Sequence, residues 1–194
     1  MKKVSLSLAV VAAMGLGISA TANAANNGKL VFNGTLTNIT CDIDSGTGTS
    51  PGNNPGEINV DLGNVSFSDI GRFADNKLST ASPIQLLVTC TGGVAQYNTV
   101  NMRFVARQGS GLDNADQKLL RTTGAADGVG IGLLNASSQL MDLSGNETID
   151  TALVKDGADG ATAEINFGAV YVLNGTPTNP GNADGFLPFV MDYQ

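Results

Sequence analysis

The sequence predicts an all-β protein, a β-sandwich of seven or eight short strands. Several segments alternate apolar and polar residues with a period of two, which is typical of strands that are buried on one face. The chain contains 25 Gly and only 14% charged residues, a mixture that favours short strands joined by turns. No helical pattern is long enough for a βαβ unit, and a hydrophobic content of 42% suffices for a core.

The strands follow one another with turn-forming segments between them. The predicted strands are residues 30–36 with a continuation to 43, then 58–62, 84–90, 100–106, 129–134, 163–172 and 186–194. Segments rich in Gly, Pro, Asn and Asp separate them, at 44–56, 109–112, 142–147 and 176–185. Pro188 donates no ladder hydrogen bond, which places the start of its strand at a sheet edge. A turn of helix is expected near 68–73 or 114–119.

Composition excludes several classes of function. The chain has no His and two Cys, which excludes imidazole triads, His-ligated zinc sites, four-thiolate zinc sites and iron–sulfur clusters. The net charge is −7 and no basic run is present, which argues against nucleic-acid binding. We therefore expect no catalytic residue, no metal and no cofactor.

The first 24 residues form an export signal. A positive start, Met1-Lys2-Lys3, precedes a mostly apolar run of about 15 residues, shorter than the ~20 that span a bilayer. Ala22-Asn23-Ala24 matches a signal-cleavage pattern, and a cut after Ala22 is the alternative. We expect residues 1–24 to be removed from a secreted, soluble protein.

Secretion bears on the two cysteines. Cys41 and Cys90 both lie after the signal, and an oxidising compartment favours their pairing over two free thiols. The pairing closes a long loop, worth about 4 kcal/mol in the chain-entropy account.

Three weaker patterns are set aside. DGADG (156–160) lacks the ligand order of an EF-hand and is best explained as an acidic turn. GVGIG (128–132) is not followed by a helix with an acidic partner, as a dinucleotide fingerprint requires. The loop carboxylate pairs Asp142/Glu147 and Asp150/Asp156 resemble a glycosidase pair only by chance.

The two ends of the mature chain are both strands with an apolar face. A strand at a free terminus either stays in its own sandwich or leaves it to pair with the open sheet edge of another domain. Periodicity alone favours the first of these interpretations.

A family resemblance reverses that preference. GKLVFNGTLTNITCDID (28–44), with Gly28 and Cys41 at the expected places, resembles the opening of chaperone–usher pilins, the subunits of type 1 and P pili. ASPIQLLVTC with Cys90, VNMRFVA, VGIGLLNASSQLM and the terminal pattern Phe189-x-Met191-x-Tyr193-Gln194 resemble later strands of that family in the same order. The resemblance covers essentially the whole mature chain.

The resemblance implies an incomplete immunoglobulin-like β-sandwich that a donor strand from a neighbouring subunit completes. Residues 25–36 would be the N-terminal donor-strand extension and 37–194 the pilin domain. The residues that would fill a neighbour's groove are Leu30, Phe32, Gly34 and Leu36, with Gly34 over a shallow pocket. The strand that would border this subunit's own groove carries Phe189, Met191 and Tyr193. The extension ahead of Gly28 is short, which leaves open whether this is a major or a minor subunit.

The same resemblance implies partners and a location. A periplasmic chaperone would lend a strand first, and the next subunit would replace it at an outer-membrane usher. The resulting head-to-tail polymer would be a surface fimbrium that mediates cell adhesion. A carbohydrate-binding tip adhesin or secreted lectin-like module is the alternative. Tip adhesins of the family carry a lectin domain before the pilin domain, and a mature chain of 194 − 24 = 170 residues has no room for one. A carboxylate-based secreted hydrolase is a third and weaker alternative.

Overall fold

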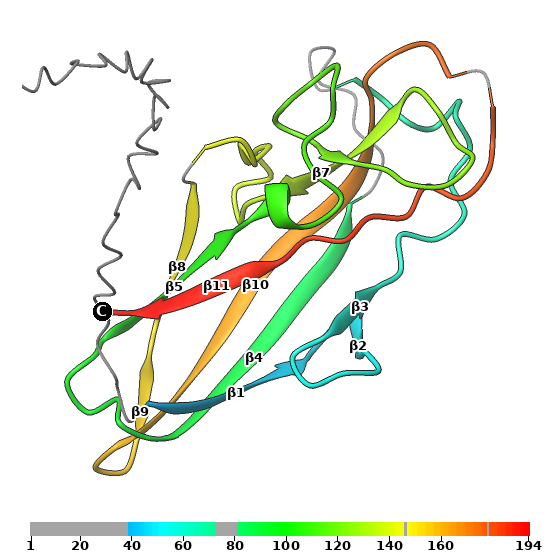
Figure 1. Cartoon of the computed structure of the whole chain (residues 1–194). Helices are drawn as coiled ribbons and strands as arrows, with labels where there is room; N and C mark the ends of the chain where they lie inside the picture. Colours follow the sequence, from blue (N-terminus) through cyan, green and yellow to red (C-terminus); the bar gives the residue numbers. More distant parts are fainter. Residues whose placement is uncertain (1–38, 73–80, 146, 178) are drawn as a thin grey trace, which may run out of the picture. The chain divides into compact units, whose positions relative to one another are not determined.

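Period-two alternation in the sequence becomes two facing β-sheets in the computed structural model (Figure 1). The structure describes residues 39–72, 81–145, 147–177 and 179–194. Secondary structure in these residues is almost entirely β. The predicted all-β sandwich is therefore confirmed.

The larger sheet has its longest strands at its centre. Within the described residues it contains six strands, in the order β1-β4-β10-β7-β6, with β9 beside β10. Their bounds are β1 (Thr40–Ser45), β4 (Ser82–Gly92), β10 (Gly160–Leu173), β7 (Val129–Leu134), β6 (Leu120–Arg121) and β9 (Val154–Asp156). All of these pairings are antiparallel, as expected where strands follow each other through turns.

The smaller sheet lies over the larger one. In the described part of the chain its order is β11-β5-β8, from β11 (Phe189–Tyr193), β5 (Thr99–Phe104) and β8 (Thr148–Ala152). A separate hairpin joins β2 (Thr49–Pro51) to β3 (Ile58–Val60).

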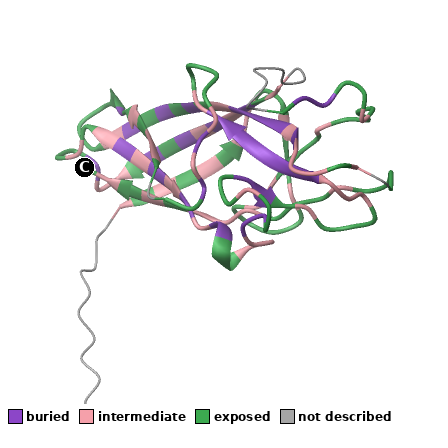
Figure 2. Cartoon of the chain, turned by 90° about the horizontal axis from the view of Figure 1, so that it is seen from above, coloured by how far each residue is buried: buried purple, intermediate pink, exposed green. Residues whose placement is uncertain are grey.

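The core fills the space between the two sheets. Val88 on β4 and Ile165 on β10 face Val100 and Met102 on β5, and each of these four side chains is at most 1% exposed. Phe104 and Phe167 meet edge to face across the layers, with ring centroids 5.6 Å apart, a favoured aromatic geometry. Figure 2 shows buried and exposed residues alternating along the strands. The alternation therefore marks the inner face of each sheet.

The predicted strands agree with the structure where it describes them, with two corrections. β7 has the predicted bounds 129–134, and β4 and β10 contain the predicted segments 84–90 and 163–172. The predicted loop 44–56 contains β2, because residues 49–51 pair with β3. The last predicted strand begins later, at Phe189. The predicted strand at 30–36 lies outside the described residues.

The helical turn predicted at 114–119 is wrong, because this segment contains turns but no helix. Of the other predicted turn, 68–73, the described residues 68–72 contain a turn and no helix, and residue 73 lies outside the described residues. The Asp113 carboxylate accepts the amides of Ala115 (2.8 Å) and Asp116 (3.0 Å), a local bond that competes with helix formation. A short 3-10 helix, η2 (Ala106–Gln108), forms instead where β5 ends.

Close packing explains the glycines of the GVGIG segment. A Cβ on Gly132 would lie 2.6 Å from Leu140 Cδ1 and 3.1 Å from Val172 Cγ2. A Cβ on Gly130 would lie 3.0 Å from the Leu119 side chain. These glycines let neighbouring side chains approach a central strand, so they serve packing.

Candidate functional site

Strand β11 forms one rim of an open side of the sandwich. It pairs with β5 through a register that sets Phe189 beside Phe104 and Met191 beside Met102. Within the described residues no strand pairs with its other edge. Phe189, Met191 and Tyr193 point inward and pack against the core, yet all three remain partly exposed.

The backbone of β11 directs polar groups toward that unpaired edge. Gln194 and Thr99 exchange both backbone hydrogen bonds, each at 2.9 Å. Because such pairs alternate along an antiparallel ladder, the N–H and C=O groups of Phe189, Met191 and Tyr193 point away from β5. These strand-edge groups are a template for an incoming strand.

Strand β1 forms the opposite rim. It pairs with β4 on one side only among the described strands. The Cys41–Cys90 disulfide joins these two strands, which confirms the predicted pairing. Cys41 and Ile43 point inward and are half-buried. The covalent link therefore holds this rim against the larger sheet.

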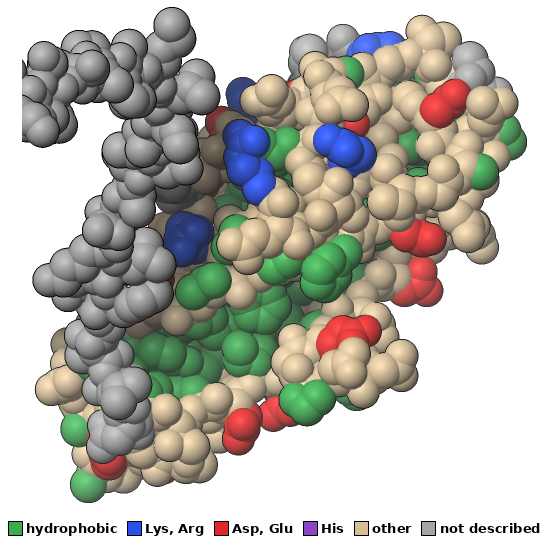
Figure 3. Space-filling model, viewed as in Figure 1, with side chains coloured by type: hydrophobic (Ala, Val, Ile, Leu, Met, Phe, Trp, Pro, Cys, Tyr) green, Lys and Arg blue, Asp and Glu red, His purple; other side chains and the backbone are tan. Residues whose placement is uncertain are grey.

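An apolar groove lies between the two rims. Figure 3 shows hydrophobic side chains gathered in a hollow of the face where Figure 1 places β11 above β1. At one end the hollow deepens into a cavity of about 1000 Å³. Its floor contains the buried side chains of Leu120, Ile131, Leu133 and Ala169. Its walls include the half-buried Ile58, Leu62, Leu187 and Phe189.

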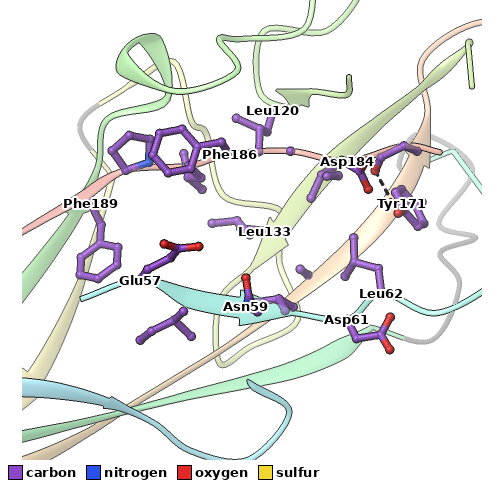
Figure 4. A pocket seen from close by; sticks show the side chains of 18 of the residues that line it. Glu57, Asn59, Asp61, Leu62, Leu120, Leu133, Tyr171, Asp184, Phe186 and Phe189 are labelled. Carbon is purple, nitrogen blue, oxygen red and sulfur yellow. Dashed lines mark hydrogen bonds between the residues drawn. The ribbon is translucent and has the colours of Figure 1, made fainter. Parts of the chain in front are cut away.

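Polar groups occur at the mouth of this cavity. Figure 4 shows Glu57, Asp61 and Asp184 around the labelled apolar side chains. The Tyr171 hydroxyl donates to the carbonyl of Ala183 at 3.0 Å. Burial, and then the nearby carboxylates of Asp184 and Asp61, raise the pKa of Tyr171. The Tyr171 hydroxyl is therefore neutral at physiological pH and serves as a structural donor.

The chemistry of the groove is that of binding. Burial raises the pKa of Tyr193 on the β11 rim, so this phenol is also neutral.

No group of three or more metal-ligating side chains occurs in the described part of the chain. Of the DGADG segment, Asp159 accepts the amides of Gly93 (2.8 Å) and Ala95 (3.1 Å). That carboxylate therefore holds a loop.

The structure brings together some of the predicted site residues. Phe189, Met191 and Tyr193 share the inward face of one rim, and the disulfide anchors the other. Leu30, Phe32, Gly34 and Leu36 lie outside the described residues. Their insertion into a neighbour's groove, and the pairing of a donor strand with β11, stay predictions.

Sequence reasoning missed the wall made by residues 57–63 and the floor made by Leu120 and Ile131. Alternation in INVDL marked residues 58–62 as a strand, but only tertiary structure shows that Ile58 and Leu62 face an open groove.

Among the described residues no helix is long and apolar enough to cross a membrane.

The fold and groove define a β-sandwich with an open, apolar side. The family model described as "Fimbrial protein" matches residues 30–194, and the chain belongs to this family. It is similar to a type-1 fimbrial protein, A chain, of Escherichia coli, with 28% identity over 202 residues that cover 100% of both chains. The corresponding protein of strain K12 is 26% identical over 201 residues, again with full coverage.

One solved structure has a weaker likeness. The CupB6 tip adhesin of Pseudomonas aeruginosa matches with a TM-score of 0.36 and 17% identity, over 63% of this chain and 34% of that one. This match is too weak to bear on function. Family membership makes the chain a subunit of a surface fimbria that assembles with other pilus subunits. The hydrolase alternative is thereby excluded, and the tip-adhesin alternative gains no support of its own.

Proposed function

We propose that the chain polymerises by donor-strand exchange into a head-to-tail fibre. The N-terminal segment, residues 25–36 after cleavage of the export signal 1–24, enters the groove of a neighbouring copy or related subunit. A contact that joins one end of a subunit to the groove of the next is heterologous and does not close into a ring, so it yields a filament. The fibre presents an adhesin at the cell surface.

The single observation that carries this proposal is the apolar groove between β1 and β11, the two strands that each pair with one neighbour among the described strands. A strand placed there gains a row of main-chain hydrogen bonds and buries alternate side chains. The segment supplies Leu30, Phe32 and Leu36 on one face, and burial of each contributes roughly 1.5–3 kcal/mol. Gly34, on the same face, fits a shallow part of the groove.

Assembly requires the groove to be covered at every stage. An exposed apolar groove promotes aggregation, so a periplasmic chaperone lends a strand after export. An outer-membrane usher then exchanges the lent strand for the N-terminal segment of the next subunit. The groove of this chain and its N-terminal segment therefore have separate partners, which an experiment can separate.

Deletion of residues 25–33 tests the proposal. The shortened subunit keeps its groove and should still bind the chaperone, but it should not enter the groove of a neighbour. Surface-sheared material from the intact chain should give a ladder on an unheated SDS gel that collapses to one band on boiling. Material from the shortened chain should give no ladder.

A matched control places alanine at Asn33, whose side chain faces away from the groove in the predicted alternation. This variant should form the ladder normally. Normal fibres from the deleted chain would contradict donor-strand exchange.

A further inference from the structure

The outer faces of the two groove rims carry only negative charge. Asp42 and Asp44 on β1 and Asp192 on β11 are exposed, and neither strand contains Lys or Arg. The residues that pair with them on the neighbouring strands β4 and β5 are uncharged: Thr89, Leu87 and Asn101. Within the described residues these three carboxylates have no cationic partner.

The N-terminal segment has the complementary pattern. Among residues 25–36 Lys29 is the one charged side chain. In a strand that directs Leu30 and Phe32 into the groove, Lys29 and Val31 face outward. The outward face of β11 presents Val190, which is 41% exposed, and Asp192. In an antiparallel arrangement, Val31 of the segment can therefore lie beside Val190 of β11 while Lys29 lies beside Asp192.

We propose that the N-terminal segment of an incoming copy docks antiparallel to β11 in the register that places Lys29 beside Asp192. The same register places Val31 beside Val190. This inference rests on the proposed donor-strand exchange and adds which residues of the groove select the register.

The inward faces and the backbone support this register. Leu30 comes to lie beside Met191 and Phe32 beside Phe189, so apolar residues meet within the groove. Because the N–H and C=O of Met191 and Phe189 point to the open edge, these inward pairs exchange the hydrogen bonds. The outward pairs are then of the non-hydrogen-bonded kind, in which cross-strand side chains lie closest.

The other end of the segment reaches the deep cavity. In this register Leu36 lies beside Gly185, which has no side chain to occupy the space. A Cβ on Gly185 would lie 2.8 Å from both Ile131 Cδ1 and Leu120 Cδ2. Leu36 thus arrives over the buried floor of the cavity.

Neighbouring registers lose these matches. A shift by one residue turns every inward side chain outward. A shift by two residues in one direction sets Val31 against the Asp192 carboxylate. The opposite shift sets Lys29 against Val190, whose partner on β5 is Arg103. The Lys29–Asp192 register therefore combines inward packing with outward charge pairing.

Disulfide trapping tests the register in the full chain. The double variant V31C/V190C should form an intersubunit disulfide, because directly opposed strand residues lie within bridging distance whereas diagonal ones do not. Its ladder should survive boiling without reductant and collapse with it. The matched controls V31C/D192C and V31C/P188C report the two shifted registers and should collapse on boiling alone.

The outcomes separate the two proposals. An unheated ladder with trapping in a control pair, or in none of the three, overturns the register and leaves donor-strand exchange standing. Absence of any unheated ladder from the unmodified chain overturns both.

A charge exchange tests the pair without cysteines. K29E alone and D192K alone should each slow polymerisation of the full chain at low salt by about fivefold, as like charges come to face each other. K29E/D192K in one chain should return the rate to within about twofold of the unmodified chain. Failure of the double variant to recover, while both singles polymerise slowly, would assign Lys29 a different partner and overturn the register.

Discussion

Two parts of the sandwich have the same alternation of apolar and polar residues but differ in how far their inward side chains are buried. We call the central strands β4 and β10 the covered half, and the groove rims β1 and β11 the open half. In β4 and β10 the inward side chains are sealed, with Val88 1% and Ile165 0% exposed. In β1 and β11 the inward side chains Ile43 and Met191 remain partly exposed. Both sets pack against the same core. The difference is what the proposed donor strand would remove, since the rims carry apolar side chains on their inner face and no other described strand covers them.

The disulfide is the strongest single link between the two halves, because it ties the β1 rim to β4. Replacement of both cysteines, C41A/C90A, should lower the free energy of unfolding by about 4 kcal/mol through the entropy of the unfolded chain. Urea unfolding of the two full-length proteins, each with an excess of synthetic peptide of residues 25–36, measures the loss. A loss below about 1 kcal/mol would show that the covered half holds the rim without this bond.

A mutation that creates a cavity in the covered half should cost the same stability whether or not the groove is occupied. I165A removes a fully buried side chain and should lower the free energy of unfolding by about 3 kcal/mol. The loss should be the same with and without the peptide, because Ile165 lies away from the groove mouth. Unequal losses in the two urea titrations would place Ile165 in contact with the inserted strand.

A rim side chain should behave in the opposite way. M191A should lower the free energy of unfolding by about 1 kcal/mol in the free chain, where Met191 is partly exposed. With the peptide bound the loss should rise to about 2–3 kcal/mol, because the side chain is then covered on both sides. Equal losses in the two states would mean that nothing covers this rim.

The smallest effect concerns a loop at the edge of the covered half. The amides of Gly93 and Ala95 hold the pKa of Asp159 below its usual value of 3.8. A carboxyl whose pKa is lowered on folding stabilises the fold above its unfolded-state pKa, and that contribution disappears as pH falls through the folded-state pKa. D159N should therefore flatten the decline of stability between about pH 5 and pH 2. An unchanged decline in acid-unfolding curves would remove Asp159 from this role.

The sequence predicted the covered half more completely than the open one. β7 was predicted with its observed bounds because apolar residues fill both of its faces and turns bound it. β2 and β8 were not predicted, since residues 49–51 and 148–152 are short and mostly polar, and their pairing comes from tertiary partners. The helical turn expected at 114–119 was wrong because Asp113 binds local amides.

The candidate site divides in the same way. The pairing of Cys41 with Cys90 was predicted from the compartment, and the shared face of Phe189, Met191 and Tyr193 from alternation. The place of that face beside a groove was implied by the family resemblance. The cavity floor at Leu120 and Ile131 was not, because periodicity shows which face of a strand is apolar but not what covers it. Whether a face is sealed or open depends on how many strands the sheet contains, and no local pattern carries that number.

Residue-by-residue amide hydrogen exchange on β11 tests most directly whether an incoming strand completes the sandwich. In the monomeric chain the amides of Phe189, Met191 and Tyr193, which point to the open edge, should exchange rapidly, while those of Val190 and Asp192, bonded to β5, should be protected. In the assembled fibre all five should be protected. Slow exchange at Phe189, Met191 and Tyr193 in the monomer, or rapid exchange there in the fibre, would contradict a groove that an incoming strand completes.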